Sequence, residues 1–276
     1  MGDQATDESR QIWDSVAAGW EKERAFINEL ERAVTERMHE ALGVRPGDTI
    51  LELCAGPGEV GLRLAEQHPD AHILITDFAP GMVQAPTNEA EQRGVKNVEC
   101  RLVDAQDIHL PNASVDGALC RYGLMLVPDI AKAFSEVRRV LRPGGVVVYT
   151  TWTPHETNPW MIFGATMIQR GHFTPPGDGS SMFMPLGTED DNIAVARAAG
   201  FENVQAEAID LPVRYPSFQR YWEVSTEIAG PLAIIVRGLP EDEREAVRSQ
   251  VEEYSAPFMT DDGLTFPSRR MFVRAS

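Results

Sequence analysis

Apolar and polar residues follow one another along the chain in two different rhythms, and the first of these is helical. Between residues 8 and 42, apolar residues recur at three- and four-residue intervals, as one face of a helix requires. That face is formed by Ile27, Leu30, Val34, Met38 and Leu42. Gly43 and the pair Pro46–Gly47 follow it, and such residues end helices. We therefore expect residues 8–42 to be helical.

The second rhythm consists of short apolar runs separated by helical patterns. The runs are residues 49–54, 72–76, 98–103, 115–120 and 145–151. The clearest helical pattern between them spans residues 130–141 and ends at Pro143–Gly145. Apolar strands that alternate with amphipathic helices indicate a parallel sheet covered on both faces. Right-handed crossovers then favour a doubly wound α/β fold.

The alternation stops after residue 151. Residues 153–187 are rich in proline, glycine, methionine and aromatic residues, and connections of this length are usually lids or binding loops. A helix over 190–199, a sixth strand over 204–209, further helices within 216–255 and a last strand over 270–274 complete the pattern. The expected organisation is a helical lid (1–44) and an α/β domain (45–276) that carries the loop 153–187 and a helical insertion at 216–255.

Charge and composition narrow the classes of partner. The net charge is −17 and the isoelectric point is near 4.7, which disfavours nucleic acid and anionic membranes as partners. No run approaches 18 apolar residues, and the polar, acidic start of the chain is unlike a secretory signal, so we expect a cytoplasmic protein without membrane insertion. The three cysteines form no CxxC pair, so we expect reduced thiols and no metal site.

Candidate chemistry begins at the turn after the first predicted strand, Glu52-Leu-Cys-Ala-Gly-Pro-Gly58. Glycines there let a ligand approach the backbone, at the carboxyl end of the strands where open α/β sheets bind ligands. The string Gly56-Pro-Gly58-Glu-Val-Gly61 also matches GxGxxG, and Asp77 follows about twenty residues later. This motif predicts an adenosine-containing ligand and leaves open a nicotinamide cofactor or S-adenosylmethionine.

Three further features favour S-adenosylmethionine. Glu52 places an acid in the first strand, and Asp104 places another after the third, where it can accept from an adenine amino group. The sequence Leu141-Arg-Pro-Gly-Gly145 leads directly into the fifth strand.

With these residues in view, the chain resembles the class I S-adenosylmethionine-dependent methyltransferases, in particular the group similar to ubiquinone/menaquinone-biosynthesis methyltransferases. The resemblance covers roughly residues 10–210 and rests on the ordered segments 50–58, 76–82, 103–106, 120–125 and 140–145. It implies a Rossmann-like sheet of seven strands, mostly parallel with the last strand antiparallel, a helical N-terminal lid and an inserted cap. Pro57 stands where the family often has threonine, so a hydroxyl contact is lost there.

The resemblance also implies a role for each matching residue. Gly56 and Gly58 would let the backbone meet the methionine part of S-adenosylmethionine, and Asp77 would take both ribose hydroxyls. Phe78 and Met82 would pack on the adenine, Asp104 would accept from its amino group, and Ala105 would add a backbone contact. The remaining cofactor-binding candidates are Glu52, Ala55, Cys120 and Arg121.

Aromatic and methionine residues near the end of the fifth strand and in the N-terminal helix predict a substrate pocket for flat or apolar molecules. The candidates are Trp13, Trp20, Tyr122, Trp152, His155, Trp160, Phe163, His172, Phe173, Met182 and Phe183. His155, His172 and Tyr122 are candidates for a base, which is needed only if the nucleophile must lose a proton. The catalytic base stays open.

The sequence therefore predicts methyl transfer from S-adenosylmethionine to O, C or N of a small, aromatic or apolar metabolite, by a monomer or homodimer. A non-catalytic relative that binds the cofactor and a nicotinamide-dependent oxidoreductase are the alternatives.

Overall fold

The computed structural model describes residues 2–174 and 185–276, without the side chains of residues 2–5, and its centre is a seven-stranded sheet. The strand order is β3-β2-β1-β4-β5-β10-β6. The strands are β1 (Thr49–Glu52), β2 (His72–Asp77), β3 (Val98–Leu102), β4 (Val115–Arg121), β5 (Leu141–Trp152), β6 (Val204–Asp210) and β10 (Arg269–Ala275). The pairs among β1–β5 are parallel, whereas β10 pairs antiparallel with β5 and β6. The predicted fold class is thereby confirmed.

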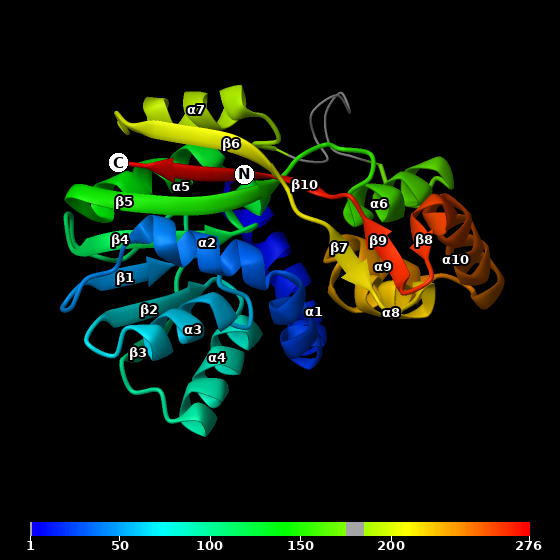
Figure 1. Cartoon of the computed structure of the whole chain (residues 1–276), viewed down its shortest axis with the longest axis horizontal. Helices are drawn as coiled ribbons and strands as arrows, with labels where there is room; N and C mark the ends of the chain where they lie inside the picture. Colours follow the sequence, from blue (N-terminus) through cyan, green and yellow to red (C-terminus); the bar gives the residue numbers. More distant parts are fainter. Residues whose placement is uncertain (1, 175–184) are drawn as a thin grey trace.

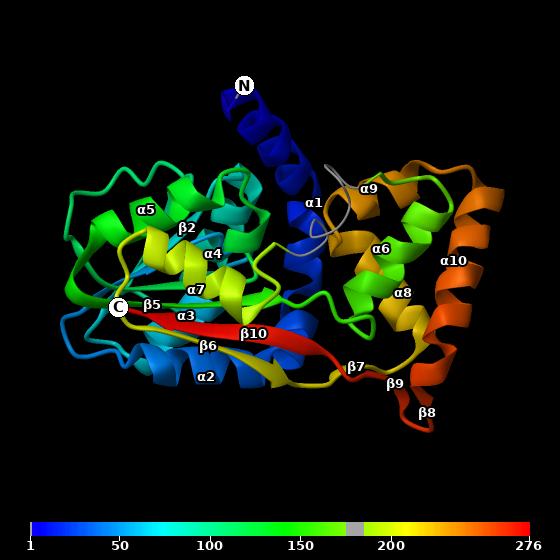
Figure 2. The ribbon, with the colours of Figure 1, turned by 90° about the horizontal axis from the view of Figure 1, so that it is seen from above.

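Helices cover both faces of this sheet (Figures 1 and 2). One face packs against α2 (Arg32–Leu42) and α3 (Glu59–Gln67), with α4 (Pro80–Arg93) beside β2 and β3. The other face packs against α5 (Ile130–Val140) and α7 (Glu189–Ala198). Within β1, Ile50 faces the first layer and Leu51 the second, because successive strand residues point to opposite faces. Both are buried, which explains the unbroken apolar run of this strand.

A cap stands beyond the carboxyl ends of the parallel strands (Figures 1 and 2). Its helices are α6 (Pro159–Gln169), α8 (Phe218–Ile228), α9 (Pro231–Gly238) and α10 (Glu241–Ser255). A small antiparallel sheet of β7 (Val213–Tyr215), β9 (Gly263–Phe266) and β8 (Met259–Thr260) joins them. The short 3₁₀ turns are η1 (Leu124–Leu126) and η2 (Ala256–Phe258). The small sheet had no counterpart in the sequence prediction.

Helix α1 (Gly2–Leu30) lies between the sheet and the cap (Figure 2). Ion pairs fix it on both sides: Arg220 of α8 donates to the buried Glu23, with Nη1 3.0 Å from Oε1, and Arg24 pairs with Glu89 of α4 at 2.5 Å. Both partners of α1 lie far from it in the sequence. The helix therefore ties the cap to the α/β domain.

Two expectations about segments need correction. The helix predicted over 8–42 is interrupted at Glu31, which separates α1 from α2, and only α1 lies over the carboxyl ends of the strands. The predicted lid of residues 1–44 is therefore divided, because α2 packs on the sheet. The segment 153–187, expected as a loop, contains the helix α6, whose first residue Pro159 has the fixed φ that a first helical turn accepts.

Candidate functional site

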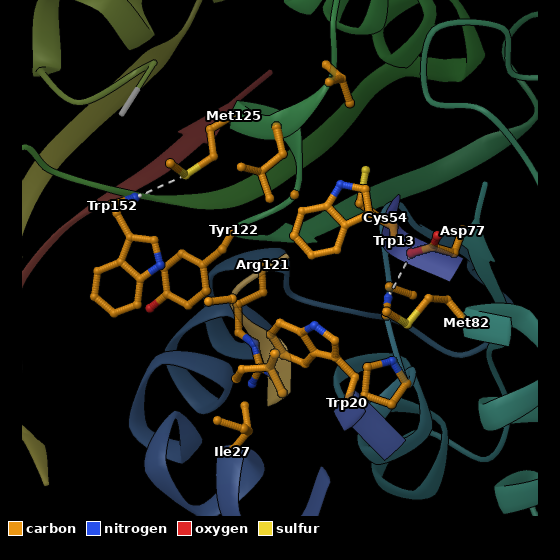
Figure 3. Close-up of a pocket in the computed structure, with 18 of the residues that line it drawn as sticks. Trp13, Trp20, Ile27, Cys54, Asp77, Met82, Arg121, Tyr122, Met125 and Trp152 are labelled. Carbon is orange, nitrogen blue, oxygen red and sulfur yellow. Dashed lines mark hydrogen bonds between the residues drawn. The ribbon is translucent and has the colours of Figure 1, made fainter. Parts of the chain in front are cut away.

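A cavity of about 350 Å³ opens at the carboxyl ends of the parallel strands, and residues of these strands, of α1 and of the cap line it. Its volume falls within the range of small-molecule pockets, roughly 300–1,000 Å³. Figure 3 shows Asp77 and Met82 at one side of this cavity and Tyr122 and Trp152 at the opposite side. The first side is called the polar end below, and the second the aromatic end.

The glycine turn after β1 presents its backbone to the cavity. Gly56 has φ +55°, and a Cβ atom added to it would meet no atom within 4 Å, so a ligand can approach its main chain. Gly58 has another role, because a Cβ there would lie 2.4 Å from Cβ of Pro86. Gly58 is not among the residues lining the cavity, so the predicted backbone contact with a ligand does not hold for it.

Asp77 lies at the end of β2 and holds the turn in place. One carboxylate oxygen accepts from the backbone N–H of Gly56 at 3.0 Å, and the other accepts from that of Ala79 at 3.0 Å. Burial raises the pKa of Asp77 to about 6, although these backbone hydrogen bonds act in the opposite direction. Each Asp77 oxygen can accept one more hydrogen bond, and Asp77 lines the cavity, so a ligand there can donate to it.

Asp104 lines the same cavity as Asp77. Its Oδ1 accepts from the backbone N–H of Gln106 at 2.8 Å, and the side-chain amide of Gln106 donates to both oxygens at 3.1 and 3.2 Å. Gln106 in turn accepts from the backbone N–H of Asp129 at 2.8 Å, so it fixes the loop beneath the carboxylate. The sequence prediction omitted Gln106, and its place directly after the Asp–Ala pair was the available signal. The two aspartates face one hollow, as the sequence hypothesis required.

Glu52 is buried at the end of β1, where its Oε2 accepts from the backbone N–H of Gly61 at 2.8 Å. Burial raises the pKa of Glu52 to about 8, against the opposing effect of the Arg121 charge. Arg121 also lines the cavity and donates to the hydroxyl of Thr35 at 2.8 Å. The remaining predicted cofactor contacts that line the cavity are Ala55, Phe78, Met82 and Ala105.

Cys120 does not line the cavity. It is fully buried, and its sulfur accepts from the backbone N–H of Leu124 at 3.2 Å. Cys54 lines the cavity in its place and has φ +50°. Gly123 allows this arrangement, because a Cβ on it would lie 2.2 Å from Cβ of Cys54.

The aromatic end is formed by stacked rings. Tyr122 lies against Trp152 with ring centroids 4.6 Å apart and an angle of 14°, and Trp160 contacts Trp152 edge-on at 6.5 Å. Phe173 belongs to the same lining, and Trp13 and Trp20 line the cavity from α1. These six predicted pocket residues therefore surround one cavity, which suits a flat, apolar ligand.

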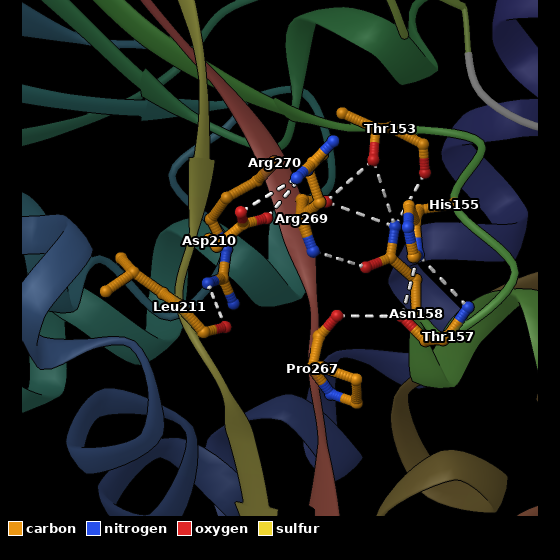
Figure 4. A network of polar contacts seen from close by, with 9 residues as sticks. All are labelled: Thr153, His155, Thr157, Asn158, Asp210, Leu211, Pro267, Arg269 and Arg270. Carbon is orange, nitrogen blue, oxygen red and sulfur yellow. Dashed lines mark hydrogen bonds and ion pairs between the residues drawn. The ribbon is translucent and has the colours of Figure 1, made fainter.

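His155 lies outside the cavity, in the junction through which the chain passes between the sheet and the cap (Figure 4). Its Nδ1 is 2.7 Å from the hydroxyl of Thr157, which donates to the carbonyl of Pro267 at 2.7 Å. In the same junction the amide of Asn158 donates to the carbonyl of Arg269 at 3.1 Å. His155 therefore helps to hold the cap, and its prediction as a pocket residue is wrong.

Two more predicted pocket residues form contacts within the cap. His172 pairs with Glu243 of α10 at 2.8 Å, and Phe163 is fully buried against Trp222 with ring centroids 5.9 Å apart. Neither lines the cavity. Met182 and Phe183 lie outside the described residues.

Several lining residues come from parts of the chain that the sequence did not connect with the site. Glu31 lines the cavity from the break between α1 and α2, and Tyr215 from β7. The others from the cap and the neighbouring lid are Ile27, Leu30, Pro159, Val213, Ile228, Ala229, Pro231 and Leu232. No signal of spacing in the sequence places these next to the glycine turn.

Among residues 2–174 and 185–276, no group of three or more His, Cys, Asp or Glu side chains could hold a metal ion. No helix in this described part is long and apolar enough to cross a membrane.

Comparison with known proteins identifies the class. Residues 50–145 match the family model described as a methyltransferase domain, and these residues carry β1, β2, β3 and β4 with the glycine turn, Asp77 and Asp104. This match identifies residues 50–145 as a methyltransferase domain, and with the sheet order it supports the class I S-adenosylmethionine-dependent methyltransferases that the motifs predict. The match therefore agrees with the methyltransferase class predicted from the motifs.

Individual relatives are more distant. The chain is similar to a demethylmenaquinone methyltransferase of Lactococcus lactis, with 31% identity over 54% of this chain and 60% of that protein. The alignments span 54 to 62% of the length of the first curated relatives.

Two solved structures share the fold over most of the chain. The YcgJ protein of Bacillus subtilis has 19% identity, a TM-score of 0.62 and coverage of 88% of this chain and 97% of that one. The cyclase SpnF has 18% identity, a TM-score of 0.57 and coverage of 95% of both chains. Since a cyclase also has this fold, the fold by itself does not specify the reaction.

Proposed function

We propose that this protein transfers the methyl group of S-adenosylmethionine to a small, flat and largely apolar molecule. One observation carries the proposal: Asp77 and Asp104 line one cavity together with an exposed glycine backbone, and the opposite end of that cavity is aromatic. The cavity thus combines the polar contacts that a nucleoside needs with walls suited to an aromatic ring.

The residues present fit the cofactor. The Gly56 backbone faces open space, and the Asp77 oxygens, already oriented by two backbone N–H groups, can accept from ribose hydroxyls. Asp104, held by Gln106, can accept from the adenine amino group, and the half-buried Phe78 and buried Met82 can pack on its faces. These roles are proposals for this chain.

The chemistry then requires little from the protein beyond geometry. S-adenosylmethionine supplies an activated methyl group on a sulfonium centre. The cavity walls hold the acceptor in line with it, and such orientation can contribute about 7–11 kcal/mol in favourable cases. The rings of Tyr122, Trp152 and Trp160 exclude water from one side of the acceptor, and α1 with Trp13 and Trp20 covers another.

Incubation with tritium-labelled S-adenosylmethionine tests the proposal. The acceptors are 1,4-naphthohydroquinone, 2-naphthol and 2-naphthylamine, which offer carbon, oxygen and nitrogen on similar flat bodies. We expect label in at least one product. If none forms although calorimetry shows that S-adenosylhomocysteine binds, the chain is a non-catalytic cofactor-binding relative. Fluorescence titration with NADH tests the oxidoreductase alternative, and no binding is expected.

A further inference from the structure

Glu31 is the buried carboxylate at the aromatic end of the cavity. It lies at the break between α1 and α2, is 5% exposed and lines the cavity. A carboxylate in such surroundings is costly unless it has partners, so its place in an otherwise aromatic wall needs a reason. Interrupting a long helix at this residue directs the side chain into the site.

Two partners hold the Glu31 carboxylate. Its Oε2 accepts from the hydroxyl of Tyr122 at 2.8 Å, and its Oε1 accepts from Nη2 of Arg270 at 3.1 Å. An ionised carboxylate can accept about four hydrogen bonds, and these two contacts use one position on each oxygen. Glu31 therefore keeps free acceptor capacity at the cavity wall.

Arg270 fixes the position of this carboxylate from behind. It is 1% exposed, its Nη1 donates to the carbonyl of Leu211 at 2.8 Å (Figure 4), and its guanidinium lies 4.7 Å from the ring centroid of Trp152. Arg270 itself does not line the cavity. A buried pair of this kind adds little net stability compared with apolar residues, because both charges lose their hydration. The arrangement suits a carboxylate that must be oriented for another purpose.

Tyr215 gives a second, independent sign of a polar ligand group at this end. It is 2% exposed and lines the cavity from β7. Its ring contacts Phe26, Tyr221 and Phe266, but among the described residues its hydroxyl has no hydrogen-bond partner. Burial raises the pKa of the Tyr215 hydroxyl, and the charge of Glu31 raises it further. Tyr215 thus adds a donor, and Glu31 an acceptor, to the lining of the same cavity.

We propose that Glu31 accepts the proton of a hydroxyl group on an aromatic substrate, an inference that rests on the proposed methyl transfer. The hydroxyl O–H bond breaks and its proton moves to a carboxylate oxygen of Glu31. The electron pair left on the substrate oxygen forms the new bond to the methyl carbon, and the carbon–sulfur bond breaks with its pair remaining on sulfur. The products are the methyl ether, the thioether of the spent cofactor and a neutral Glu31. The substrate class is therefore a hydroxyarene, with Tyr122 and Arg270 as positioning residues.

Binding tests the acceptor role without turnover. Equilibrium dialysis in the presence of S-adenosylhomocysteine compares 2-naphthol with naphthalene, which lacks the hydroxyl. We expect the wild type to favour 2-naphthol, and Glu31→Gln to lose at least tenfold in affinity for 2-naphthol and none for naphthalene. Glu23→Gln is the matched control, because Glu23 is, like Glu31, a buried carboxylate paired with an arginine, but it lies within α1 and outside the cavity. Equal or absent binding of both compounds by the wild type overturns the proposal.

Turnover tests the proton transfer. A general base contributes about 10²–10⁴-fold, so kcat of Glu31→Gln with 2-naphthol should fall at least 100-fold while its affinity for S-adenosylhomocysteine is unchanged. The loss should shrink with 1-nitro-2-naphthol, a more acidic acceptor that is already ionised without a base. An equal loss with both acceptors would mean that Glu31 only positions the substrate.

Two further outcomes separate this inference from the proposed function. If the wild type methylates 2-naphthol and Glu31→Gln retains its rate, the role of Glu31 is wrong and methyl transfer stands. If 2-naphthol binds through Glu31 but no acceptor is methylated, the proposed function fails instead. Should Glu31→Gln not fold, Glu31→Asp keeps a charge opposite Arg270 but draws the carboxylate back from the cavity. We then expect Glu31→Asp to lose affinity for 2-naphthol and to keep its affinity for naphthalene.

Discussion

Replacing Asp77 by asparagine should weaken cofactor binding strongly while leaving the fold intact. Alanine would be a poor choice, because both Asp77 oxygens accept backbone hydrogen bonds, one from Gly56 and one from Ala79. An alanine at this position would leave both of these N–H donors without partners. Asparagine keeps one carbonyl oxygen and the volume of the side chain. The charge and one acceptor are lost.

The size of the effect follows from the hydrogen bonds that Asp77 is proposed to accept from two ribose hydroxyls. A hydrogen bond to a charged group contributes about 1.5–3 kcal/mol, and about 1.4 kcal/mol corresponds to a tenfold change in affinity. Loss of one such bond and weakening of the other predicts roughly a 100-fold rise in the Kd of S-adenosylhomocysteine.

The pH dependence gives a signature specific to this residue. Burial raises the pKa of Asp77 to about 6, so the group is ionised above that pH and protonated below it. Because a protonated carboxyl accepts less well, affinity of the wild type should fall as the pH drops from 7 to 5. Asp77→Asn has no such ionisation, so this part of the pH dependence should disappear.

Isothermal titration calorimetry with S-adenosylhomocysteine at pH 5, 6, 7 and 8 measures both effects, and thermal unfolding of the ligand-free variant checks the fold. Asp104→Asn serves as the comparison, since it removes a charge from the same cavity but keeps Asp77, so the pH dependence of the wild type should remain. Wild-type affinity in Asp77→Asn, or an unchanged pH dependence, would refute the assignment of Asp77 to the cofactor.

Two further predictions concern the supports of the site. The pKa of Glu52 is raised to about 8 in the folded protein, against about 4.3 when unfolded, so between these values the folded state holds a proton that the unfolded state has lost. The free energy of unfolding should therefore fall with rising pH by up to about 1.4 kcal/mol per pH unit. Urea unfolding at pH 5 and pH 8 measures this decline, and Glu52→Gln should remove the part due to Glu52. An equal decline in the wild type and the variant would contradict the prediction. Gly123→Ala should cost about 1–3 kcal/mol because its Cβ would lie 2.2 Å from Cβ of Cys54, whereas Gly238→Ala, with no atom within 4 Å, should cost nothing by the same measurement.

The α/β core was predictable because its signals are local. Each strand is a short apolar run, each crossover helix has its own apolar face, and Gly56, Asp77 and Asp104 follow the strands that position them. In a parallel sheet the carboxyl ends of the strands meet at one edge. The strands themselves and the place of the polar end therefore follow from residues that act close to their own positions in the chain.

The aromatic end depended on contacts between segments far apart in the sequence. His155 and His172 stand in a segment of the expected composition, yet the junction with Pro267 and the pair with Glu243 draw them away from the cavity. Glu31 continues a helical pattern in the sequence, and only the tertiary structure shows that Tyr122 and Arg270 hold its side chain.

The amino-acid sequence by itself thus determined the sheet, its class and the polar half of the cavity, because hydrophobic period and turn chemistry act over a few residues. The tertiary structure decided which side chains face the acceptor. That choice depends on how the cap docks through α1 and the junction at residues 153–158, 211 and 267–270, where partners up to 239 positions apart meet and no local pattern encodes the pairing.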